Sequence, residues 1–124
     1  EEKNYIIDLG ITSHQEKVNL LHISDVLVLP SEYEAFGIVF LEAWSCGIPV
    51  IGTDKGAIPN VINSSGLTFK CGDKQDLAEK IEFLLNNPSL SKIMATNGKN
   101  KVINFYNSDR IGELVLNAYK EVLT

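Results

Sequence analysis

The stretch that decides the fold is residues 31–42, S-E-Y-E-A-F-G-I-V-F-L-E. It places one glutamate, Glu34, just before an Ala-Phe-Gly turn, and a second, Glu42, eight positions later within the run I-V-F-L-E-A-W-S-C. Apart from Glu42, that run holds only apolar residues and one serine, which predicts a largely buried helix over residues 38–46. Phe40 and Trp44 of this helix are expected in the hydrophobic core of the domain. A carboxylate in such a helix is costly unless it is paired.

The partner of Glu42 cannot be read from its own helix. Its four helical neighbours include no cation: Ile38, Val39, Ser45 and Cys46. The sequence therefore predicts a partner that is distant in the chain, or a bound ligand. A glutamate that faces solvent on an amphipathic helix is the simpler alternative, and the pattern alone leaves it open.

Length, charge and cysteine usage bound the kind of protein. At 124 residues the chain fits one domain with a sizeable core. A net charge of −5 argues against nucleic acid or an anionic membrane as the main partner. No apolar stretch approaches the ~20 residues that span a bilayer, and E-E-K-N-Y is no secretory signal. Cys46 and Cys71 follow neither a CxxC nor a Cys/His metal spacing, so a reduced, cytoplasmic setting is expected.

Short β-like runs alternate with longer helical patterns along the chain. Strands are expected over residues 5–9, 26–29, 49–52 and 66–69, with helices over 14–23, 38–46, 57–62, 76–85, 89–105 and 110–123. The run 26–29 is expected to be buried on both faces of the sheet. This order predicts an α/β, Rossmann-like three-layer domain with a short parallel sheet and extra C-terminal helices.

Two connections leave strands at the edge where parallel sheets bind ligands. They are residues 30–37 and 53–56, and each holds a glycine close to a helix start, Gly37 and Gly56. Free N–H groups and the positive end of the helix dipole can hold an anion at such a position. The sequence therefore predicts a phosphorylated ligand at this edge.

The charged residues around this edge are placed to meet different parts of a ligand. If the helix begins near Gly37, Glu42 lies about 7.5 Å further along its axis, which suits hydroxyl groups such as those of a ribose. Glu34 precedes the helix and could reach the other end of the ligand. Lys55 adds a cation and Asp54 is a secondary candidate, although a solvated lysine and a turn aspartate are the simpler interpretations.

Residues 24–62, S-D-V-L-V-L-P-S-E-Y-E-A-F-G-I-V-F-L-E-A-W-S-C-G-I-P-V-I-G-T-D-K-G-A-I-P-N-V-I, resemble the donor-binding half of retaining nucleotide-sugar glycosyltransferases. These are the group 1 (family 4) enzymes with a GT-B fold and an E-x7-E motif, which Glu34 and Glu42 match. The resemblance begins near Tyr5 and covers nearly all of the chain. Ala35 and Ala57 replace glycines common in the family, and Asn60 stands where the family often has Glu.

The resemblance implies a role for each residue at this edge. Glu42 would accept hydrogen bonds from the ribose hydroxyls. Glu34 would be the catalytic residue, at the donor sugar near the reacting centre. Four consecutive backbone amides would hold the distal phosphate and sugar hydroxyls: those of Ala35, Phe36, Gly37 and Ile38. Asp54, Lys55 and Gly56 complete the expected donor-binding residues. The sugar of a UDP-, GDP- or ADP-sugar would pass to an acceptor hydroxyl with retained configuration, without a metal or other cofactor.

The resemblance also implies that residues 1–124 are a single donor-binding domain of a longer two-domain enzyme. The family's preceding strand, its Arg and Lys pair and its acceptor domain have no counterpart, and the only arginine, Arg110, lies in the C-terminal helical region. This chain alone is therefore expected to be inactive. The acceptor (carbohydrate, lipid or small molecule) and any peripheral membrane contact would belong to the missing N-terminal domain. A non-catalytic nucleotide-sugar-binding module and one subunit of a split glycosyltransferase are the alternatives.

Overall fold

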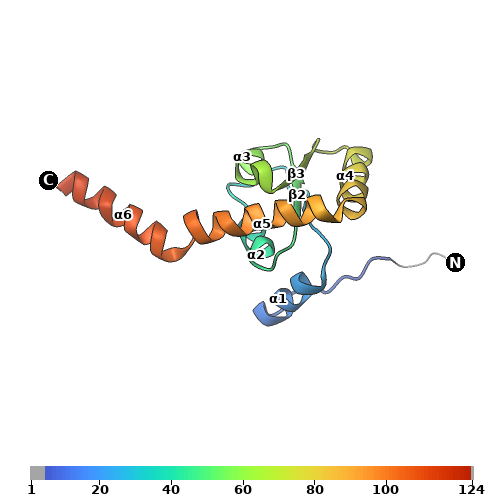
Figure 1. The fold of residues 1–124 in the computed structure, drawn as a ribbon, viewed down its shortest axis with the longest axis horizontal. Coiled ribbons are helices and arrows are strands. Elements are labelled where there is room, and N and C mark those ends of the chain that lie inside the picture. The colour runs from blue at the N-terminus through green and yellow to red at the C-terminus, as the bar shows by residue number, and fades with distance from the viewer. Residues whose placement is uncertain (1–4, 124) are drawn as a thin grey trace.

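The computed structural model describes residues 5–123 as a small parallel sheet with helices on both faces and one helix that extends away (Figure 1). The strands β1 (Leu27–Leu29), β2 (Val50–Thr53) and β3 (Gly66–Phe69) lie in the order β1-β2-β3. Six α-helices are described: α1 (His14–Ile23), α2 (Ile38–Ser45), α3 (Ile58–Ile62), α4 (Lys74–Asn86), α5 (Pro88–Phe105) and α6 (Ser108–Leu123). A 3₁₀ turn, η1 (Asn63–Ser65), joins α3 to β3.

The two faces of the sheet carry two separate cores, because successive strand residues point to opposite sides. Val50 and Leu29 pack with α2 and α3 on one face. Ile51, Val28 and Phe69 pack with residues of α4 on the other. The parallel pairing and the two covered faces confirm the predicted three-layer α/β domain.

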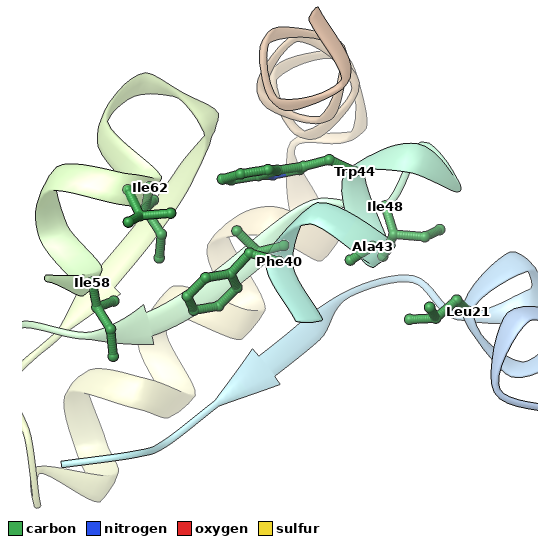
Figure 2. Close-up of a cluster of buried hydrophobic side chains, with 9 residues drawn as sticks. Leu21, Phe40, Ala43, Trp44, Ile48, Ile58 and Ile62 are labelled. Carbon is green, nitrogen blue, oxygen red and sulfur yellow. The ribbon is translucent and has the colours of Figure 1, made fainter. Parts of the chain in front are cut away.

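Helix α2 supplies the centre of the first core and determines how closely α5 can approach. Phe40, Ala43 and Trp44 are fully buried (Figure 2). The Trp44 indole N–H donates to Ser65 O at 3.0 Å. Gly98 of α5 lies against this indole, since a Cβ built at Gly98 would come within 2.2 Å of the ring. The two helices are in contact because position 98 has no side chain.

A half-buried lysine, Lys101, links α5 to the end of α3. Lys101 Nζ donates to Val61 O at 3.1 Å and to Ile62 O at 2.8 Å, and it lies 5.5 Å from the Trp44 ring centroid. These bonds satisfy carbonyls at the end of α3. Partial burial lowers the pKa of Lys101. The Lys101 amine therefore has a structural role, because its hydrogen bonds go to backbone carbonyls of α3.

Two strand predictions are wrong. Residues 5–9 form no strand, and Tyr5, Ile6 and Ile7 are each at least 80% exposed. A strand needs a hydrogen-bonded neighbour, and this run finds none in the described chain. The residues of β1 are half-buried, not buried on both faces, because β2 is the one strand beside β1 within residues 5–123.

Helix α6 stands apart from both cores. It has no buried residue, and Figure 1 shows it leaving the end of α5 and pointing away from the sheet. Apolar side chains nevertheless recur along it: Ile111, Leu114, Val115, Tyr119 and Val122. None of the helices in residues 5–123 combines the length and apolar character needed to cross a bilayer.

Candidate functional site

The connections after β1 and β2 meet at the carboxyl edge of the sheet, as the sequence predicts. Thr53, at the end of β2, is buried and donates its hydroxyl hydrogen bond to Ser31 O at 2.6 Å. A Cβ built at Gly56 would lie 3.2 Å from Glu34 O, so the second connection runs directly beside the first. Two segments more than twenty residues apart thus form one surface.

Helix α2 begins at this surface without a side-chain cap. Gly37 occupies the N-cap position with φ 86°, a left-handed conformation that favours glycine, and no side chain caps the helix. A Cβ there would also collide with the Phe40 ring at 2.7 Å. Because the first N–H groups of a helix lack intrahelical acceptors, this start is suited to an anion.

The residues on either side of Gly37 differ in their exposure to solvent. Ala35 is exposed and the Ile38 side chain is 68% exposed, so the chain is open to solvent on both sides of the glycine. Phe36 is half-buried and packs edge-on against Tyr106, with ring centroids 5.2 Å apart. That contact ties the connection to the end of α5 and fixes the backbone before α2.

Glu34 is half-buried and lies beside the start of α2. Its Cγ would be 3.6 Å from a Cβ at Gly37. Its carboxylate makes no hydrogen bond or ion pair with any residue between 5 and 123. Glu34 is therefore an uncommitted acceptor next to the uncapped helix end.

Glu42 has a distant partner, which confirms one of the two predicted solutions. Lys17 Nζ lies 2.7 Å from Glu42 Oε1, and the two side chains are 42% and 28% exposed. The helix is buried on one face only, so Glu42 lies between the buried and the solvent-facing interpretations. The sequence pattern does not identify Lys17 as this partner, although its position one turn before Leu21 places it on the packed face of α1.

The second connection, residues 53–56, offers a ligand fewer available polar groups than the first. Asp54 Oδ1 accepts from Cys71 N at 3.0 Å, and Asp54 N donates to Phe69 O at 2.9 Å. These bonds link the ends of β2 and β3, which favours a structural role for Asp54. Lys55 and Gly56 are exposed, and the Lys55 ammonium makes no ion pair within the described residues. No three His, Cys, Asp or Glu side chains of residues 5–123 come together as a metal site.

Comparison with known proteins gives the family. The sequence model described as "Glycosyl transferases group 1" matches residues 2–101. The chain is 37% identical over 106 residues to N-acetyl-alpha-D-glucosaminyl L-malate synthase of Bacillus anthracis, an alignment that covers 84% of this chain and 28% of that protein.

Solved structures share the fold. Sucrose-phosphate synthase of Thermosynechococcus elongatus superposes with a TM-score of 0.83 at 28% identity, over 93% of this chain and 29% of that one. Anabaena Alr3699/HepE, solved in complex with UDP and glucose, has a TM-score of 0.86 at 21% identity, over 96% of this chain and 33% of that one. The chain thus spans 28–33% of the length of these three proteins. Since the family model matches most of its residues, the chain belongs to the group 1 glycosyl transferases.

Proposed function

We propose that this chain is the donor-binding domain of a longer, two-domain retaining glycosyltransferase. It binds a nucleotide-diphosphate sugar, and the full-length enzyme transfers the sugar to an acceptor hydroxyl with retention of configuration. The observation that carries the proposal is the arrangement along α2, whose uncapped start at Gly37 is followed by the partly exposed carboxylate of Glu42. The UDP and glucose bound to Alr3699/HepE, a protein of the same fold, support it.

The uncapped start of α2 is suited to the diphosphate. The backbone amides of residues 35–38 would donate to the distal phosphate, and Lys55 and Gly56 in the adjoining connection lie on the same surface. Negative charge grows on the diphosphate as its bond to the sugar breaks. Fixed N–H groups and a nearby cation stabilise that charge, so the step needs no metal ion in this proposal.

The two glutamates bind opposite ends of the donor. Glu42, about 7.5 Å along the helix from Gly37, accepts hydrogen bonds from the ribose hydroxyls. Glu34 lies before the helix, where its uncommitted carboxylate can bind and orient the donor sugar near the reacting carbon. Asp54 borders this surface through its bonds to the β3 connection.

Isothermal titration calorimetry with UDP, GDP and ADP tests the proposal. One of the three is expected to bind, and Glu42→Gln is expected to weaken it tenfold or more, because a hydrogen bond to a charged group contributes about 1.5–3 kcal/mol. Glu82→Gln is the matched control, since Glu82 is an exposed carboxylate on α4, on the other face of the sheet. Two results would contradict the proposal. One is no binding at millimolar nucleotide, and the other is equal nucleotide affinity for the wild type, Glu42→Gln and Glu82→Gln.

In a second candidate the acceptor-binding part is a separate polypeptide, and one observation fits this candidate as well as it fits the first. Helix α6 keeps an apolar face that nothing in the described chain covers. An open reading frame that continues upstream of Glu1 would favour the single two-domain enzyme, and a stop directly before it would favour the split form. In either case this chain alone is expected to transfer no sugar.

A further inference from the structure

The ion pair between Lys17 and Glu42 brings a cation from a separate helix to the central carboxylate. Lys17 Nζ of α1 lies 2.7 Å from Glu42 Oε1 of α2, across 25 positions of sequence. Two other ion pairs in the described chain each join residues three or four positions apart within one helix. Local helical spacing therefore explains those two pairs but not this one.

The position of Lys17 is fixed from two sides. One turn further along α1, on the same face, Leu21 is 7% exposed and packs into the core that contains Ala43 of α2 (Figure 2). At the start of α1, Ser13 Oγ accepts from Glu16 N, and Glu16 Oε2 accepts from Ser13 N. This capping box holds the first turn in place. The Lys17 side chain is thus directed at α2 by packing and by capping.

Stability alone is a weak explanation for the pair. The two side chains are 42% and 28% exposed, and ion pairs with this degree of exposure contribute little to folding. Leu21 already attaches α1 to the core. What the pair does determine is the orientation of the Glu42 carboxylate.

That orientation leaves one oxygen of Glu42 free. Lys17 donates to Oε1, and Oε2 accepts no hydrogen bond from any described residue. A carboxylate oxygen has two lone pairs and no hydrogen, so it can accept from neighbouring hydroxyls but cannot donate. An acceptor oriented in this way matches a vicinal diol, where two O–H groups lie side by side.

We infer that Lys17 is a positioning residue of the donor site. It holds the Glu42 carboxylate so that Oε2 accepts from the 2′,3′-diol of the nucleotide ribose, and it thereby favours ribonucleotides over 2′-deoxyribonucleotides. The inference rests on the proposed function and adds a residue from α1, outside the E-x7-E segment. Lys17 acts through Glu42, so its effect should vanish when the carboxylate or the diol is removed.

Calorimetry with a ribonucleotide and its 2′-deoxy form tests this inference. The probe is whichever of UDP, GDP and ADP the chain binds, with its 2′-deoxy counterpart. Lys17→Met is expected to weaken the ribonucleotide about tenfold, since a charge-assisted contact then no longer orders the carboxylate, and to change the deoxy form far less. In the double variant with Glu42→Gln, Lys17→Met should add no further loss.

Two variants serve as controls. Lys80→Met removes the same charge from a lysine of similar exposure, 36%, whose partner is Asp76 on α4. It should leave nucleotide affinity unchanged. Lys17→Arg keeps a cation at the same place and should restore most of the affinity that Lys17→Met loses.

Each contrary result has a distinct meaning. Equal losses for the ribonucleotide and its deoxy form would show that Lys17 only supports the fold, which overturns the inference. Lys17→Met that behaves like Lys80→Met overturns it as well, while a clear effect of Glu42→Gln in the same series leaves the proposed function standing. If Glu42→Gln itself has no effect, the proposed function is wrong.

Discussion

At the scale of single residues, the two glutamates of the motif differ in their surroundings. Glu42 lies on a helix with an ion-pair partner on one oxygen, whereas Glu34 lies in a connection and has no polar partner among residues 5–123. A paired carboxylate is held in one orientation, and an unpaired one is free to meet a ligand. This difference fits Glu42 as a fixed recognition group and Glu34 as the group nearer the sugar.

The difference predicts that Glu34 contributes to binding of the sugar and not of the nucleotide. Glu34→Gln is expected to leave the affinity for the nucleoside diphosphate within about twofold and to weaken the matching nucleotide sugar about tenfold, through lost hydrogen bonds to sugar hydroxyls. Calorimetry with both ligands measures the ratio. A parallel loss for both ligands would place Glu34 at the nucleotide instead.

Acidic residues at helix starts add stability that depends on pH. Asp76 Oδ2 accepts from the Lys70 backbone N–H at 2.7 Å, and this bond lowers the pKa of Asp76. Because the pKa is lower in the folded state, the contribution is present above the unfolded value of 3.8 and is lost as pH falls through the folded value. Asp76→Asn should therefore destabilise the protein at neutral pH.

Urea unfolding at two pH values measures this effect. The difference in unfolding free energy between wild type and Asp76→Asn should be largest near about pH 7 and should shrink as the pH falls through the lowered pKa of Asp76, because the wild-type carboxyl then becomes protonated. A difference that stays constant between the two pH values would show that charge at position 76 plays no part.

At the scale of elements, the contact between α2 and α5 holds the site helix in place. Trp44 is buried between them, anchored by its bond to Ser65 O, and Gly98 leaves room for its ring. The nearly continuous apolar run over residues 38–46 predicts the first of these helices and the burial of Phe40 and Trp44. It could not predict which glycine meets the indole, because helix pairing depends on residues more than fifty positions apart.

This contact predicts different stabilities for two glycine-to-alanine variants. Gly98→Ala should destabilise the protein by about 1–3 kcal/mol, since the new methyl group collides with an anchored ring, even though alanine favours helices. Gly112→Ala, in exposed α6 with nothing within 4 Å of the new Cβ, should cause no loss. Chemical denaturation of both variants gives the comparison. Equal behaviour would mean that α5 can shift to accept the methyl group.

At the scale of the whole molecule, prediction from sequence succeeds for elements with a strong local pattern, including the exposed helix α6, and fails where a feature depends on distant neighbours. The helices and the strands over residues 26–29, 49–52 and 66–69 have strong local patterns and were predicted. Residues 5–9 have an equally β-like composition but no strand beside them, so composition alone misled. The Lys17–Glu42 ion pair could not be predicted from the sequence for a related reason, since it depends on how α1 packs against α2.

The isolation of α6 predicts that the rest of the chain does not need it. Deletion of residues 108–124 should change the free energy of unfolding by less than about 1 kcal/mol, because no α6 side chain is buried and little apolar area is lost from the cores. Tyr106, which packs on Phe36, is retained. A large loss of stability on deletion would mean that α6 packs onto the body of the protein.

NMR titration shows most directly where a nucleotide binds on the chain. Backbone amide shifts of the labelled protein are followed during titration with UDP, GDP and ADP and their sugar conjugates, with Glu42→Ala measured in parallel. If this edge of the sheet binds the donor, the largest shifts should cluster at residues 34–42 and 53–57 for one base and should disappear in the variant. Shifts centred elsewhere, or shifts that persist in Glu42→Ala, would contradict donor binding at this edge.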